Sequence, residues 1–186
     1  MFERLTIPDV FLFAPKRFGD SRGHFTETYN RAVLEPMTGP LEWVQDNVSL
    51  SAPRGVVRGL HFQIPPFAQD KLVRCVRGAI RDVVLDIRKG SPTYGRHVSV
   101  VISAHNGAQL FVPKGFAHGF ATLEPDVEIA YKVSNYYSPA CDRGVLWNDE
   151  TLGIDWGIDA SEATLSEKDL LLPRFSDLAD YFQYPC

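Results

Sequence analysis

An all-β barrel or sandwich with short C-terminal helices is the fold class that this sequence predicts. Short runs rich in β-branched and aromatic residues recur along the first two thirds of the chain, and turns containing Gly, Pro, Asn or Asp separate them. Clear patterns for helix starts return only near the C-terminus. Many short strands without intervening helices favour a closed or double-layered antiparallel architecture.

Composition limits the kind of protein. The 186 residues favour one domain, residues 1–186, that can bury a core. A hydrophobic share of 45% is ordinary for a globular protein. The net charge of −4 and pI of about 5.7 do not indicate nucleic-acid binding. Arg and Lys residues inside strand-like runs are therefore local features, and a small anion is their expected partner.

The cysteines indicate a reducing compartment. Cys75, Cys141 and Cys186 are widely spaced, odd in number and form no CxxC pair, so a cytoplasmic protein is expected. The apolar run Val10–Ala14 is too short for a signal-peptide core. No run approaches the length of a membrane span.

The N-terminal third predicts strands, a turn and one helix. Asn30 is the expected N-cap of the helix, and Pro36 is its expected end. In the strand at 43–50, alternation places Gln45, Asn47 and Ser49 on one face. The expected order is one or two strands at 5–14 around Pro8, a turn at 19–23, a strand at 24–29, the helix at 30–35 and the strand at 43–50.

The middle of the chain predicts a succession of strands. Turns at Asn106-Gly107, 113–115 and Pro125-Asp126 separate the later ones. The expected strands are 56–62, 71–77, 79–88, 96–103, 108–112, 119–123 and 127–133. Helix starts follow at 166–170 and 176–179.

The run Gly55–Gln63 is the most informative stretch. It reads as a strand, yet it carries Arg58, His61 and Gln63, and Lys71 opens the next strand. Protein interiors tolerate such groups only when they are paired or used, so these strands are expected to form a pocket wall. Arg58 and His61 differ by an odd number and would face opposite sides of a regular strand. A bulge at Gly59 would bring both to one side.

Two motifs resemble the cupin double-stranded β-helix, a jelly-roll barrel. The run from Gly107 to His118 is similar to the second cupin motif, and 55–78 is similar to the first. A metal-binding cupin has a His-x-His pair and a carboxylate in its first motif, whereas this chain has His61-Phe62-Gln63 and Lys71. An ammonium has no lone pair and repels a cation, so no catalytic metal is expected.

A closer resemblance covers the chain from about Leu5 to the Ser176 region. The chain resembles the dTDP-4-dehydrorhamnose 3,5-epimerase family, through strings at 55–63, 71–74, 84–88, 115–120, 131–132, 147–149 and 165–169. The resemblance implies a nucleotide-sugar substrate, dTDP-4-dehydro-6-deoxyglucose. A base would remove the acidic protons beside the 4-ketone and an acid would return protons to the opposite face, at carbons 3 and 5. It implies no cofactor.

The resemblance assigns four catalytic residues. His61 matches the general base, Asp169 its carboxylate partner, Tyr131 the general acid, and Lys71 a cation near the enolate oxygen. Each has a structural alternative. His61 and Tyr131 could be satisfied core residues, Lys71 could reach solvent, and Asp169 could cap its own helix because Ser166-x-x-Asp169 is also a capping-box pattern.

The resemblance also assigns substrate-binding residues. Turn and strand polarity explains most of them almost as well, and structural support of its loop is the alternative for His118. Two departures from the family pattern are Asp142 where a glutamate is usual, which puts that ligand contact in doubt, and Trp156-Gly157 where Trp-Pro is usual. The matching positions are Arg22, Glu27, Gln45, Asp46, Asn47, Arg58, His118, Tyr137, Asp142 and Lys168.

Other functions remain open at this point. An epimerase acting at carbon 3 or carbon 5 alone, or on another nucleotide-linked keto sugar, would keep the same residues. A sugar-binding cupin without catalysis would not need the His61–Asp169 pair, and a metal-dependent enzyme is disfavoured by Gln63 and Lys71. The resemblance implies a homodimer. Net charge and the lack of a long apolar run predict no nucleic-acid or membrane partner.

Overall fold

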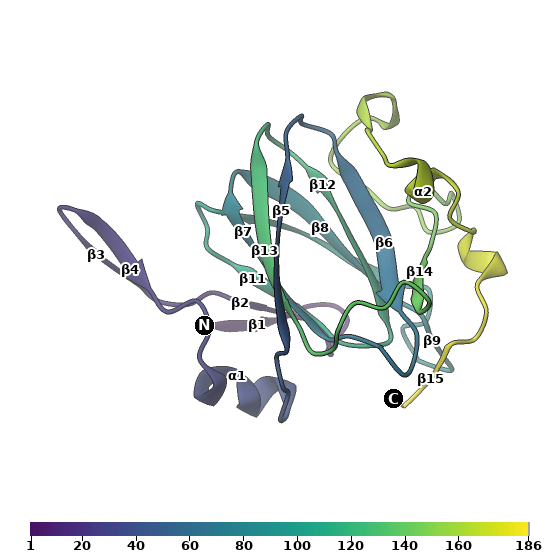
Figure 1. Ribbon diagram of the computed structural model, residues 1–186, viewed down its shortest axis with the longest axis horizontal. Helices are drawn as coiled ribbons and strands as arrows, with labels where there is room; N and C mark the ends of the chain where they lie inside the picture. Colours follow the sequence, from purple (N-terminus) through teal and green to yellow (C-terminus); the bar gives the residue numbers. More distant parts are fainter. Residues whose placement is uncertain (186) are drawn as a thin grey trace.

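Two antiparallel sheets face each other in the computed structural model, which describes residues 1–185 (Figure 1). Cys186 lies outside the described residues. The six-stranded sheet has the order β1 (Phe2–Arg4), β2 (Phe11–Phe13), β11 (Gln109–Val112), β7 (Lys71–Arg77), β13 (Val127–Val133) and β5 (Gln45–Ser51). The five-stranded sheet has the order β10 (His97–Ser103), β8 (Ala79–Asp86), β12 (Phe116–Thr122), β6 (Val57–Gln63) and β14 (Asp142–Gly144).

Short elements complete the architecture. β3 (Arg17–Asp20) and β4 (Gly23–Thr26) form a hairpin, and β9 (Arg88–Lys89) pairs with β15 (Phe182–Gln183). The helices are α1 (Arg31–Thr38), α2 (Glu167–Leu170) and two 3₁₀ helices, η1 (Ala160–Glu162) and η2 (Phe175–Asp177). The fold is the expected cupin-type jelly roll with short C-terminal helices.

Apolar side chains fill the barrel and cover both sheets. Inside it, residues such as Val73, Ile80 and Ile129 are at most 1% exposed. The C-terminal segment, including Trp147 and Trp156, packs on the outer face of the five-stranded sheet, along β6 and β14 in Figure 1. The helix α1 packs Leu34 against the outer face of β2, β7 and β11. Burial on both faces explains why β12 has a mostly apolar sequence.

Most predicted strands are confirmed, and β7 and β13 have the predicted bounds. The N-cap at Asn30 is confirmed, because its side chain accepts a hydrogen bond from the Ala32 N–H. The predicted helix end at Pro36 is wrong, since α1 continues to Thr38. Proline removes one donor from the helix but permits its final turn, which ends where Gly39 adopts a positive φ of 73°. The predicted start at Ser176 is also wrong, because Arg174 precedes η2.

The predicted bulge at Gly59 is confirmed. β12 pairs His118 with His61 and Phe120 with Arg58, so two residues of β6 between these pairs lie opposite one residue of β12. Gly59 has a φ of 109°, and a Cβ there would lie 2.6 Å from the His118 carbonyl oxygen. Glycine is therefore required where the two strands approach, and the bulge turns both Arg58 and His61 toward the barrel interior.

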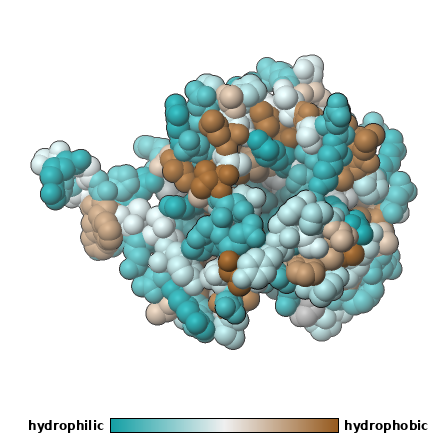
Figure 2. Space-filling model, viewed as in Figure 1, coloured by the Kyte–Doolittle hydropathy of each residue, from teal (hydrophilic) through white to brown (hydrophobic). Residues whose placement is uncertain are grey.

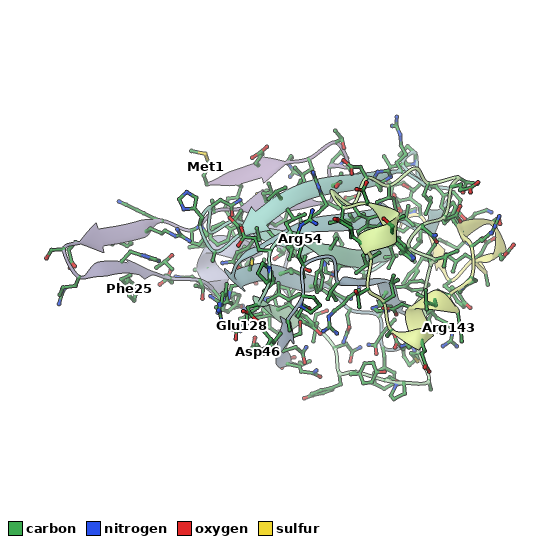
Figure 3. All side chains as sticks on the ribbon, turned by 90° about the horizontal axis from the view of Figure 1, so that it is seen from above. Met1, Phe25, Asp46, Arg54, Glu128 and Arg143 are labelled. Carbon is green, nitrogen blue, oxygen red and sulfur yellow. The ribbon has the colours of Figure 1, made fainter. Side chains whose placement is uncertain are left out.

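The β3–β4 hairpin extends away from the barrel (Figure 1). Arg17 fixes its base by donating hydrogen bonds of 2.6 Å to the carbonyl oxygens of Ala104 and His105. Phe18 and Phe25 on this arm are 53% and 68% exposed, and Figure 3 shows Phe25 on the arm, outside the barrel. No helix within residues 1–185 has the length and apolar character needed to cross a membrane.

Candidate active site

A cavity of about 460 Å³ opens between the two sheets. Its walls come from β6, β7, β12 and β13, and the segment 164–169 closes one side. A second cavity of about 340 Å³ adjoins it and shares His61, Lys71, Tyr131 and Lys168 with the first. The four residues predicted to be catalytic, His61, Lys71, Tyr131 and Asp169, all line the first cavity.

His61 and Asp169 form a close pair. The Nε2 atom of His61 lies 2.6 Å from Oδ1 of Asp169. The Asp169 side chain is 5% exposed and that of His61 is 30% exposed, so the carboxylate is sheltered while the imidazole reaches the cavity. A carboxylate that accepts a hydrogen bond from Nε2–H leaves the lone pair on Nδ1, which suits a general base.

The environment keeps Asp169 ionised. Burial alone would raise the pKa of Asp169, but the hydrogen bond and electrostatic interaction with His61 outweigh it, and the backbone of Gly59 adds a further hydrogen bond. The pKa of Asp169 is therefore lowered. The helix cap comes from Ser166, whose Oγ accepts from the Asp169 N–H at 3.2 Å, while the Asp169 carboxylate is bonded to His61 as the dyad hypothesis predicts. Capping uses the backbone of Asp169, so its carboxylate remains available to His61.

Tyr131 and Lys71 come from the sheet opposite His61. Tyr131 lies on β13 and Lys71 on β7, whereas His61 lies on β6 of the other sheet. Burial raises the pKa of Tyr131, and the Arg58 charge opposes this only partly, so its phenol keeps its proton at neutral pH. Burial lowers the pKa of Lys71 to about 8, although Asp142 and Asp82 act to raise it.

A second histidine–carboxylate pair lies deeper in the barrel. His118 Nε2 is 2.5 Å from Oδ1 of Asp82, and Asp82 is fully buried. The other oxygen of Asp82 has no hydrogen-bond partner among the described residues. Asp82 was not predicted as a site residue, although an aspartate in the middle of an apolar strand is costly unless it is paired. Both cupin-motif histidines are thus bonded to carboxylates.

The predicted binding residues divide into two groups. Arg58, His118 and Lys168 line the first cavity, and Gln45, Asn47, Tyr137 and Asp142 line the second. Arg58 is held in place by hydrogen bonds of 3.2 Å to Ser51 Oγ and the Leu50 carbonyl oxygen. Asp142 accepts hydrogen bonds from Lys168 and, at 3.2 Å, from the Tyr137 hydroxyl.

Three predicted binding residues lie outside both cavities. Asp46 is on the outer face of β5 and pairs with Lys132 at 2.9 Å. Arg22 is in the turn of the arm and pairs with Asp20, and Glu27 follows the arm and accepts a hydrogen bond from Asn30. Cavity residues that sequence reasoning did not single out include Phe120, Leu165 and Gln69. Phe120 and Leu165 are apolar, and an apolar side chain gives no distinctive sequence signal for a binding site.

Known proteins have sequences similar to this one. The family model described as dTDP-4-dehydrorhamnose 3,5-epimerase matches residues 4–177. A Sinorhizobium fredii protein named dTDP-4-dehydrorhamnose 3,5-epimerase is 51% identical over 183 residues, covering 98% of this chain and 93% of the relative.

Solved structures agree. The crystal structure of dTDP-4-dehydrorhamnose 3,5-epimerase from Bacillus anthracis with TDP and PPi bound is 49% identical, with a TM-score of 0.90 and coverage of 94% of this chain and 98% of that one. The dTDP-6-deoxy-D-glucose-3,5-epimerase of Legionella pneumophila, in complex with dTDP-4-keto-L-rhamnose, is 36% identical with a TM-score of 0.94, covering 100% and 99%. This chain belongs to the dTDP-4-dehydrorhamnose 3,5-epimerase family.

Proposed function

We propose that the protein converts dTDP-4-dehydro-6-deoxy-D-glucose to dTDP-4-dehydro-L-rhamnose by epimerisation at carbons 3 and 5. The observation that carries this proposal is the His61–Asp169 pair, which faces Tyr131 from the opposite sheet across one cavity. Family membership and the ligand of the Legionella relative support the choice of substrate.

The geometry suits proton abstraction beside a ketone. Nδ1 of His61 takes a proton from the carbon next to the carbonyl group, and Asp169 stabilises the imidazolium that forms. Negative charge moves to the ketone oxygen as an enolate. Lys71, when protonated, and Arg58 line the same cavity and would stabilise this oxygen.

Tyr131 would complete the inversion. Its raised pKa keeps the phenol protonated until an enolate is present, and its position on the opposite sheet lets it deliver the proton to the other face of the ring. Exchange with water then returns a proton to Tyr131 and removes one from His61. The cycle balances without a redox step, so we propose that no cofactor takes part.

We further propose that the active form is a homodimer. The arm that carries Arg22 and Phe25 leaves its own barrel, so those side chains can meet a substrate only in another copy (Figure 3). The edge strand β5 also exposes Val48 and Leu50, at 72% and 53%. Apolar side chains gather over this side of the molecule in Figure 2, and such patches commonly form interfaces.

A deuterium count tests the function. The protein is incubated with dTDP-4-dehydro-6-deoxyglucose in heavy water, and NMR or mass spectrometry locates the label. We expect deuterium at both carbon 3 and carbon 5, abolished by His61→Ala but retained in His105→Ala, which removes an exposed histidine outside both cavities. Label at one carbon only would indicate a mono-epimerase. Label no higher than in a control without enzyme would overturn the substrate assignment.

A further inference from the structure

Asp142 joins two parts of the candidate site. It lies on β14, opposite Gln63 of β6, and its side chain is 12% exposed. Its Oδ2 atom accepts hydrogen bonds from Lys168 of α2 and from the Tyr137 hydroxyl of the preceding loop. Lys168 is the neighbour of Asp169, so the Asp142–Lys168 ion pair ties the short helix that carries Asp169 to the barrel.

The carboxylate of Asp142 also lines the cavity that contains Lys71. The Lys71 ammonium forms no hydrogen bond within residues 1–185. Its protonation therefore depends on burial and on the charges around it. Burial lowers the pKa of Lys71. The carboxylates of Asp142 and Asp82 act to raise it, and Asp142 has the larger effect. Several titratable or charged groups line the two cavities around Lys71 or act on its charge. They are Arg58 and His61 of β6, Asp82 of β8, His118 of β12, Tyr131 of β13, Tyr137 of the loop before β14, Asp142 of β14, and Lys168 and Asp169 of α2.

We propose that Asp142 is a positioning residue whose carboxylate holds Lys168 and Tyr137 in place and supplies negative charge to the cavity that also contains Lys71. This inference rests on the proposed function, because a charged Lys71 is what an enolate oxygen requires. It gives the shorter acid at this position a role that needs no direct contact with the substrate. The side chain is already engaged by two protein donors.

Removing either partner of the Asp142–Lys168 ion pair tests the inference, because the two changes should shift the protonation of Lys71 in opposite directions. Asp142→Asn removes a negative charge near Lys71 and so favours its neutral form. Lys168→Met breaks the same ion pair but removes a positive charge, which favours charged Lys71. If Asp142 only held the loop and helix together, both variants would disturb Lys71 in the same way.

The experiment is a titration without substrate. Lysine side chains carry ¹³C at Cε, and Lys71→Met identifies the Lys71 resonance. We expect the Lys71 midpoint to move down by roughly 0.5 to 1 pH unit in Asp142→Asn and to move up in Lys168→Met. Asp142→Glu keeps the negative charge, so its Lys71 midpoint should lie close to that of the unmodified protein. Asp177→Asn neutralises an exposed carboxylate outside both cavities and should leave the midpoint unchanged.

The outcomes separate the inference from the proposed function. A Lys71 midpoint that is unmoved in Asp142→Asn, or that moves down in both charge variants, would overturn the role of Asp142 whatever the substrate. Absence of deuterium exchange in the unmodified protein would instead overturn the proposed function and leave the titration valid. If Asp142→Asn does not fold, as judged by its thermal unfolding, Lys168→Met still decides the sign, because a Lys71 midpoint that does not rise in that variant would overturn the inference.

Discussion

His61 Nε2 lies 2.6 Å from Asp169 Oδ1, although 108 positions separate the two residues in the chain. The strand β6 supplies the imidazole, and the C-terminal segment returns across the cavity to supply the carboxylate. Because Asp169 is almost fully buried and its pKa is lowered, it presents a fixed negative charge to one ring nitrogen. The other ring nitrogen is therefore the one available for chemistry.

Replacing Asp169 by asparagine should slow turnover with little change in substrate affinity. The amide cannot stabilise the imidazolium and can hold the wrong tautomer, so we expect kcat to fall by about 10²- to 10⁴-fold. Steady-state kinetics would measure kcat and KM separately. Glu167→Gln makes the same change of carboxylate to amide at an exposed residue of α2 and should leave kcat and KM near their original values. A loss confined to KM would contradict the proposed role of Asp169.

Activity should fall as the pH rises above about 8. The pKa of Lys71 is lowered to about 8 by burial, and the charged form is the one that stabilises an enolate. A pH profile of kcat should therefore show an alkaline limb near this value, and Lys71→Met should be slow at every pH. An alkaline limb that persists unchanged in Lys71→Met would assign it to another group.

Lys71 should also affect stability with a definite sign. Its pKa is lower in the folded state than the ordinary 10.5, so the unfolded chain binds more protons between about pH 8 and 10.5. The contribution of Lys71 to the free energy of unfolding consequently rises through this window. Urea unfolding of the protein and of Lys71→Met at pH 7.5 and 9.5 would measure it. The unmodified protein should gain stability relative to the variant at the higher pH.

Local patterns predicted most of the strands, whereas the site residues that line the cavities were assigned through the resemblance to the epimerase family. Alternation in β5 placed Gln45, Asn47 and Ser49 on one face, and that face is turned toward the cavities. The same alternation puts Asp46 with Val48 on the other face, so Asp46 lies away from the cavities. Strand alternation alone therefore separates Asp46 from its two neighbours, and its assignment to the binding residues conflicted with this pattern.

Contacts between residues that are distant in the sequence could not be predicted from local patterns. The bond between His118 and Asp82 joins β12 to β8, and no spacing in the sequence encodes their pairing. β14 was missed because Asp142–Gly144 has no β-branched residues and is a strand only through its pairing with β6. The direction of the arm depends on Arg17 reaching carbonyl groups of the turn at 104–105, a contact that local propensity cannot predict.

Asp86 should be essential for stability. Burial alone would raise the pKa of its carboxyl group, but hydrogen bonds from Arg88, Ser91 and Thr93 outweigh burial and lower it. Asp86→Asn leaves Arg88 partly unpaired and should cost about 3 kcal/mol of unfolding free energy at pH 7. Because the folded pKa is lowered, this stability is present above about pH 3.8 and is lost as the pH falls through the folded value. Urea unfolding at neutral pH and in acid would show the variant's deficit shrinking as the pH falls.

Removing the Tyr131 hydroxyl should separate proton abstraction from inversion. Tyr131→Phe keeps the ring on the cavity wall but removes the proposed donor, while His61 and Asp169 remain intact. We expect deuterium to enter the substrate from the His61 side with its configuration retained, and the epimerised product to fall by at least about 10²-fold. NMR reports label and configuration in one sample. Undiminished epimerisation would exclude Tyr131 as the acid.

Mixing two inactive variants should restore activity if the arm completes the site of a partner copy. The first variant, Arg22→Ala with Phe25→Ala, has a damaged arm but an intact His61, and the second, His61→Ala, has an intact arm. In a mixed dimer, the first subunit receives the arm of the second and forms one complete site. Random exchange of subunits should then recover about a quarter of the original activity. If the arm served its own barrel, no mixed dimer would contain a complete site and the mixture would stay inactive. Size-exclusion chromatography of each variant would establish that both still form dimers, so that failure of complementation counts against arm exchange and not against assembly.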